Sequence, residues 1–124
     1  MAKVLVVEDI AYTRDGMCDI LCSLGHYVDA ATDGADADVF LKLFKYDLVV
    51  TDIMMPHKNG FELVKDIRKN TPSTKILVIS GGGNFYNQDI CDAISDVASD
   101  KSIQKPFSKR EFISSVNDLI TEGD

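Results

Sequence analysis

The chain has 124 residues, of which 45% are hydrophobic and 27% charged, so it fits one globular domain and does not resemble a disordered chain. Twenty acidic residues against thirteen lysines and arginines leave a net charge of −7. This charge argues against direct binding of nucleic acid, which depends on basic side chains that neutralise phosphates. No apolar run approaches the roughly 20 residues that span a bilayer, and no signal peptide is recognisable, so we expect a cytoplasmic protein without membrane insertion.

The first half of the chain alternates short apolar runs with segments of helical spacing. The first predicted strand is residues 4–7, and a helix that ends at Gly25 follows it. The apolar residues of this helix share one stripe: Ile10, Met17, Leu21 and Leu24. A strand at 28–31 and a helix at 35–45 come next, and then a strand at 48–50. The predicted apolar face of the second helix consists of Val39, Phe40, Leu43 and Phe44.

The second half continues the alternation. A helix is predicted at 61–69 and a strand at 76–79, followed by a less regular helix at about 87–97 and a weaker strand at 102–104. Ser108 is a good N-cap for the last helix, because Glu111 follows it three residues later.

Five strand–helix alternations with short connections predict an α/β fold. Such a chain forms βαβ units with right-handed crossovers, so the helices cover both faces of one parallel sheet. Three of the apolar runs are continuous, which is typical of strands buried on both faces. We expect a single domain over residues 1–124, without a second or output domain.

Polar residues follow the predicted strands at the points where the strands end. These residues are Glu8, Asp9, Asp52, Ser80 and Lys105. The carboxyl ends of parallel strands form the ligand-binding edge of an open α/β sheet, so these side chains should converge there. Three clustered carboxylates repel one another unless a cation compensates, and oxygen ligands without histidine or cysteine favour Mg²⁺.

The same set of groups is suited to phosphoryl chemistry. A divalent cation and the Lys105 ammonium would offset the charge of phosphoryl oxygens, and a carboxylate could carry the phosphoryl group as an acyl phosphate. Asp52 is the best candidate for that carboxylate, because it ends the predicted central strand.

Four motifs in order resemble the receiver domain of two-component response regulators, across nearly the whole chain. They are residues 3–9 (KVLVVED), 52–56 (DIMMP) followed by Gly60, 79–81 (ISG) and 105–107 (KPF). The resemblance implies a flavodoxin-like, doubly wound sheet of five parallel strands in the order 2-1-3-4-5, with five helices.

The resemblance also implies a role for each matching residue. Asp52 would be the phosphoacceptor, the Ser80 hydroxyl would bind the phosphoryl oxygens and Lys105 would pair with them. Mg²⁺ would be held by Glu8, Asp9, Asp52 and the backbone carbonyl of Met54. The peptide bond between Lys105 and Pro106 would be cis.

Two features depart from the family pattern. Ser102 stands where the family commonly has the aromatic residue of its switch, which leaves the route of signal transmission open. The run Gly81–Gly83 follows the fourth strand, and we interpret it as a flexible output loop rather than a phosphate-binding loop.

The sequence therefore predicts a receiver that is phosphorylated at Asp52 by a sensor histidine kinase or a histidine phosphotransfer protein. It would signal through an unidentified protein target or by phosphoryl relay, and would catalyse only its own phosphoryl uptake and loss. The alternative is a phosphorylation-independent interaction module with the same fold. An aspartyl-phosphate phosphatase is disfavoured, because Met54 occupies the position of that class's second aspartate.

Overall fold

The computed structural model describes residues 1–53, 60–81 and 100–122. They form a single five-stranded parallel sheet in the order β2-β1-β3-β4-β5, as the resemblance predicts. The strands are β1 (Lys3–Val7), β2 (Tyr27–Ala31), β3 (Leu48–Asp52), β4 (Lys75–Gly81) and β5 (Lys101–Lys105). The helices are α1 (Ala11–Ser23), α2 (Gly34–Leu43), α3 (Gly60–Asn70) and α5 (Lys109–Glu122). The fourth predicted helix, at 87–97, and most of the glycine-rich loop lie outside the described residues.

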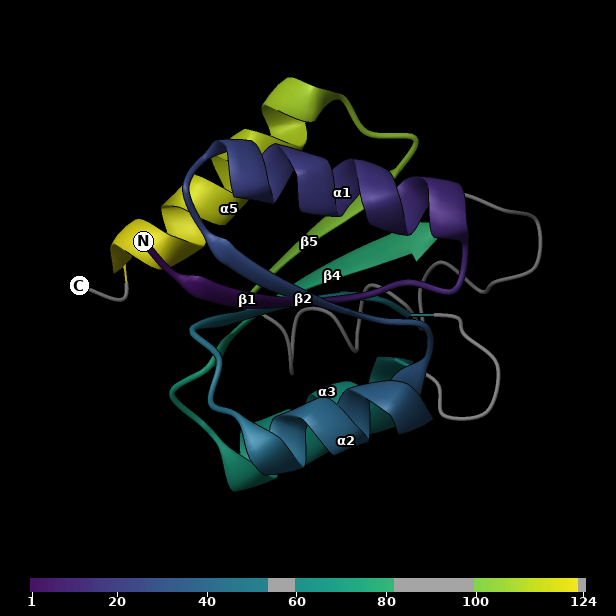
Figure 1. The fold of residues 1–124 in the computed structure, drawn as a ribbon, viewed down its shortest axis with the longest axis vertical. Helices are drawn as coiled ribbons and strands as arrows, with labels where there is room; N and C mark the ends of the chain where they lie inside the picture. Colours follow the sequence, from purple (N-terminus) through teal and green to yellow (C-terminus); the bar gives the residue numbers. More distant parts are fainter. Residues whose placement is uncertain (54–59, 82–99, 123–124) are drawn as a thin grey trace.

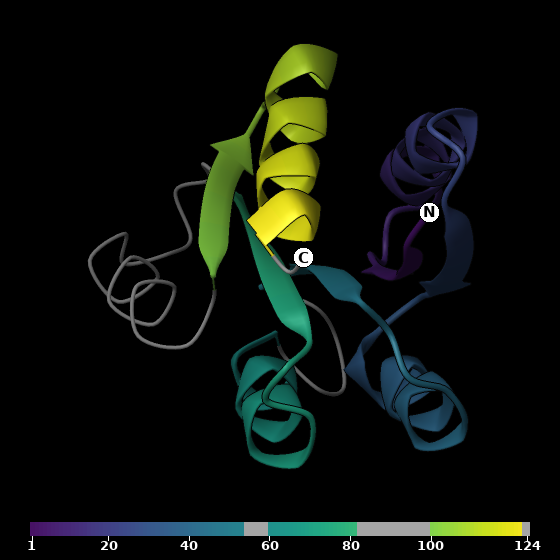
Figure 2. The same cartoon turned by 90° about the vertical axis from the view of Figure 1, so that its left-hand side faces the viewer.

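Helices cover both faces of the sheet, α1 and α5 on one and α2 and α3 on the other (Figure 1). Figure 2 shows the same two layers after a quarter turn. The side chains of β1 alternate between the layers: Leu5 and Val7 belong to the core on the α2/α3 side, and Val4 and Val6 to the core on the α1/α5 side. All four are fully buried, which explains why the strand reads as a continuous apolar run.

Local signals set the limits of two helices. The Ser108 hydroxyl accepts the N–H of Glu111 at 3.0 Å, which confirms the predicted N-cap of α5. Gly25 has a φ of +90° just after α1, and the N–H groups of Gly25 and His26 donate to carbonyls of the last turn, a Schellman motif. None of the helices among the described residues is long and apolar enough to cross a bilayer.

The prediction of the buried face was wrong for parts of two helices. In α1 only Met17 and Leu21 are buried, because Ile10 is the N-cap and Leu24 the C-cap, and both are partly exposed. In α2 the inner side consists of Ala37, Phe40 and Leu41. The expected core residues on its other side are instead exposed to solvent: Val39, Leu43 and Phe44. Apolar residues occupy two sides of α2, so periodicity alone did not identify the side that meets the sheet.

Candidate functional site

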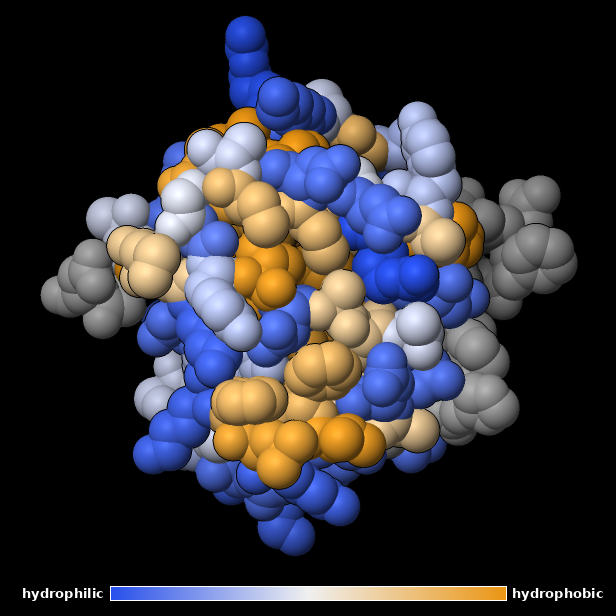
Figure 3. Space-filling view, viewed as in Figure 1, coloured by the Kyte–Doolittle hydropathy of each residue, from blue (hydrophilic) through white to orange (hydrophobic). Residues whose placement is uncertain are grey.

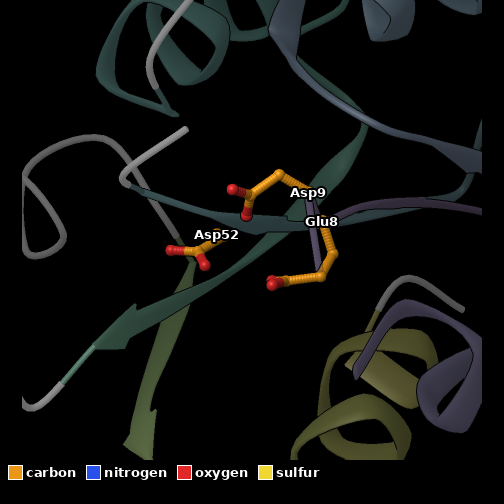
Figure 4. Close-up of side chains that lie close together, drawn as sticks. All are labelled: Glu8, Asp9 and Asp52. Atoms are coloured by element: carbon orange, nitrogen blue, oxygen red, sulfur yellow. The ribbon is translucent and has the colours of Figure 1, made fainter. Parts of the chain in front are cut away.

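The site lies at the carboxyl ends of β1, β3, β4 and β5, as the strand-end residues predict. Glu8 directly follows β1, and Asp52 is the last residue of β3. Both acids are buried, whereas Asp9 is exposed. Carboxylate oxygens of the three residues lie within 4.8 Å of one another. Figure 4 shows that their side chains point into the same space, although they come from two strands.

The Lys105 side chain, at the end of β5, contacts two of these acids. Its Nζ atom lies 2.8 Å from Oδ2 of Asp52 and 3.2 Å from each carboxylate oxygen of Glu8. The Glu8 side chain is fully buried and that of Asp52 is 7% exposed, so water screens these charges poorly. The sequence predicted that Lys105 would reach this edge, but its contact with Glu8 was not foreseen.

The Glu8 carboxyl and the Lys105 ammonium have altered pKa values. Burial, and next the negative charge and hydrogen bond of Asp52, raise the pKa of Glu8 to about 7 against the opposing effect of Lys105. Burial works to lower the pKa of Lys105, but the hydrogen bonds and charges of Asp52 and Glu8 outweigh it and raise that pKa. Lys105 therefore stays protonated, whereas the raised pKa of Glu8 favours its protonated form more than that of an ordinary carboxyl group.

Backbone contacts fix the strand ends that carry these groups. The N–H of Glu8 donates to the carbonyl of Ala31 at the end of β2, at 3.1 Å, and Arg14 of α1 donates to the carbonyl of Glu8 at 2.8 Å. Past Asp52, the N–H of Ile53 donates to the carbonyl of Ile79 in β4 at 3.1 Å. The two acids thus lie on backbone that is tied to three neighbouring elements.

Gly60, the first residue of α3, packs directly on the end of β3. A Cβ atom at this position would lie 2.5 Å from the carbonyl oxygen of Asp52 and 2.5 Å from Cα of Ile53. Its N–H donates to the carbonyl of Ile53 at 2.8 Å. The sequence marked Gly60 as part of a motif, but no sequence signal showed that it supports the backbone of Asp52.

Three other predicted features of the site have different outcomes. Ser80 is buried in β4, one residue beyond the position that pairs with Asp52 in register, so it lies at the same edge of the sheet. The Lys105–Pro106 bond is cis, which confirms the prediction. Met54, whose carbonyl was expected to bind the metal, lies outside the described residues.

The residues present fit a hard divalent cation. Mg²⁺ prefers oxygen ligands and is commonly held by one or two carboxylates together with water. Within the described part of the chain three carboxylates converge here, and the Lys105 ammonium is the one cation seen against them. Asp9, the most exposed of the three, leaves the group open to solvent.

Comparison with known proteins gives a consistent result. Residues 4–117 match the family described as the response regulator receiver domain. The chemotaxis protein CheY of Thermotoga maritima is 36% identical over 116 residues, which cover 93% of this chain and 94% of that protein. The two-component response regulator PhoP of Pseudomonas aeruginosa is 32% identical over 95% of this chain, but this chain spans only 51% of it.

Solved structures agree with the sequence comparison. The receiver domain of the Francisella response regulator 1452 has a TM-score of 0.87 and 28% identity, with full coverage of both chains. The response regulator TrrA of Thermotoga maritima, solved in complex with Mg²⁺-BeF, has a TM-score of 0.83 and 31% identity and covers 96% of this chain and 99% of its own.

Proposed function

This chain belongs to the response regulator receiver domain family, and from that membership we propose that Asp52 is the residue at which it accepts a phosphoryl group. One observation carries the proposal: the Lys105 ammonium donates to the Asp52 carboxylate at 2.8 Å, inside a group of three acids. A carboxylate held in this way has a defined orientation, and the ammonium that holds it can next bind a phosphoryl oxygen.

The reaction transfers a phosphoryl group between two side chains. One oxygen of Asp52 attacks the phosphorus of a phosphohistidine on a sensor kinase or phosphotransfer protein. The new O–P bond forms as the N–P bond breaks, and the imidazole that leaves takes up a proton from solvent. The Lys105 ammonium remains at the site and offsets the charge on the phosphoryl oxygens. In this proposal the hydroxyl of Ser80, which is buried near the end of the adjacent strand, donates a further hydrogen bond to the phosphoryl group.

We propose Mg²⁺ as the cofactor of this site, held by Glu8, Asp9 and Asp52. When bound, the ion supplies positive charge against the oxygens of the incoming phosphoryl group. The likeness to TrrA, solved with Mg²⁺-BeF, supports this choice of ion. We further propose that the chain catalyses only its own phosphoryl uptake and loss, and that a separate protein target reads the phosphorylated state.

Intact mass spectrometry after incubation with acetyl phosphate and Mg²⁺ tests the site. Wild type should gain the mass of one phosphoryl group, and a chelator should abolish the gain. Asp52→Asn should show none, whereas the matched control Asp19→Asn, at an exposed position of α1, should behave as wild type. Failure of folded wild type to gain mass, with a phosphorylated histidine kinase supplied as a second donor, would contradict the proposal and favour the phosphorylation-independent module.

A further inference from the structure

Helix α2 presents an apolar stripe to solvent. Ala35, Val39 and Leu43 are spaced by four residues, so they lie on one side of the helix. Val39 is 57% exposed and Leu43 69%, although such side chains are ordinarily buried. The space-filling view shows apolar side chains gathered on this face of the molecule, over the position of α2 (Figure 3). This α2 stripe takes no part in the phosphorylation site.

The charges along α2 are segregated. Its N-cap and first half carry three acids: Asp33, Asp36 and Asp38. Its last turn carries Lys42, and Lys45 follows. A second helix of the same sequence is complementary to α2 only when it runs antiparallel, because acid then faces lysine at both ends. A parallel arrangement places like charge against like.

We propose that the α2 stripe docks a second copy of this chain, with the two α2 helices antiparallel about a two-fold axis at Val39. In that register Val39 meets its own symmetry mate, and Ala35 of each copy meets Leu43 of the other. The small side chain thus leaves room for the large one. Lys42 of one copy then lies on the same side of the contact as Asp38 of the other. A two-fold contact of this kind is closed, so it yields dimers and not filaments.

The size of the stripe sets the expected strength. From Ala35 to Leu43 it spans nine residues, or about 12 Å of helix. Stable complexes bury roughly 800 Å² on each partner, more than three side chains supply. We therefore expect a reversible dimer with a dissociation constant on the order of 10⁻⁵ to 10⁻³ M. Sedimentation velocity from about 10 μM to 1 mM spans this range.

Two pairs of variants test the face by sedimentation. Val39→Glu, which brings two carboxylates together at the axis, should weaken dimerisation at least tenfold. Its control Leu24→Glu changes an exposed apolar residue at the end of α1 and should have no effect. Lys42→Glu should weaken the dimer severalfold, whereas Lys69→Glu makes the same charge change on exposed α3 surface and should not. A wild type that stays monomeric at 1 mM, or a dimer indifferent to Val39→Glu, would overturn the proposal.

Cysteine cross-linking tests the register. Val39→Cys should cross-link to its own symmetry mate under mild oxidation, with the linked peptides identified by mass spectrometry. Ala35→Cys alone should not, because the two copies of that position lie about 12 Å apart along the axis, beyond the reach of a disulfide. The double variant Ala35→Cys/Leu43→Cys should link position 35 to position 43. Links that run instead through the native, exposed Cys22 would place the contact on α1 and refute this one.

Discussion

A single methyl group at Gly60 should disturb the phosphorylation site through the backbone. In Gly60→Ala the new Cβ would lie 2.5 Å from the carbonyl oxygen of Asp52 and from Cα of Ile53. Ordinary contact begins at 3.4 Å, so the two segments must separate by about an ångström. The backbone there cannot easily yield, because Ile53 is fully buried and its N–H is bonded to β4. We expect a loss of about 1–3 kcal/mol in the free energy of unfolding, as for other overpacked sites.

The same substitution elsewhere provides the control. At Gly16, in the middle of α1, an added Cβ would meet nothing within 4 Å, so Gly16→Ala should stabilise the protein by about 0.5–1 kcal/mol through helix propensity. At Gly25 there is equal room but a φ of +90°, so Gly25→Ala should cost about 1–2 kcal/mol. The free energies of unfolding of the three variants in urea therefore report separately on crowding at Gly60, helix propensity at Gly16 and backbone strain at Gly25.

Phosphoryl uptake is the second readout for Gly60→Ala. Because the clash falls on the peptide that follows Asp52, the variant should also take up phosphoryl from acetyl phosphate more slowly than wild type. Gly25→Ala should retain the wild-type rate, since it lies at the opposite end of α1 from the site. A Gly60→Ala protein as stable as wild type would refute the reasoning, because it would show that β3 and α3 can separate at no cost.

Three further changes have definite expected outcomes. Lys105→Met removes the ammonium from Asp52 and should lower the free energy of unfolding in urea, without metal, by about 1.5–3 kcal/mol. The control Lys101→Met, on the same strand, breaks an exposed ion pair and should lower it by less than about 1 kcal/mol. Phe112→Ala empties a fully buried site and should cost about 3–5 kcal/mol by the same measurement. Burial, and next the N-terminal charge, lower the pKa of His26 in the folded state. The stability that the neutral His26 side chain provides should therefore be fully present above the unfolded pKa of about 6.5 and be lost as the pH falls below that value. The stability difference between wild type and His26→Gln should accordingly shrink between pH 7.5 and 5.5, and a constant difference would contradict the assignment.

The sheet could be predicted from the sequence because its signal is local. Strands buried on both faces must be apolar at every position, and the first, third and fourth strands meet that requirement. The strand order did not follow from local pattern and came from the family resemblance. The orientation of α2 was predicted wrongly, since apolar residues lie on both of its sides and periodicity did not show that Ala37, Phe40 and Leu41 form the inner one.

The sequence predicted which residues meet at the ends of the strands, but not the contacts that their side chains make. Because parallel strands share one carboxyl edge, the convergence of Glu8, Asp52 and Lys105 follows from topology alone. The pKa of Glu8 does not, because it depends on full burial beside Asp52 and on where the Lys105 side chain ends. Those are properties of three side chains from segments far apart in the sequence, and no local pattern records them.

The exposure of Ser102 bears on how the phosphorylated state would be read. In β5 the buried side chain is Ile103, whereas Ser102 and Gln104 on either side of it are exposed. A small exposed hydroxyl offers no large group that could exchange a buried position for an exposed one. Phosphorylation still adds about −1.5 to −2 charge at Asp52, beside an exposed Asp9. We therefore expect a target that senses charge at the carboxyl edge of the sheet, so its affinity for the phosphorylated chain should fall steeply with added salt. An affinity that salt leaves unchanged would instead require a packing change elsewhere on the surface.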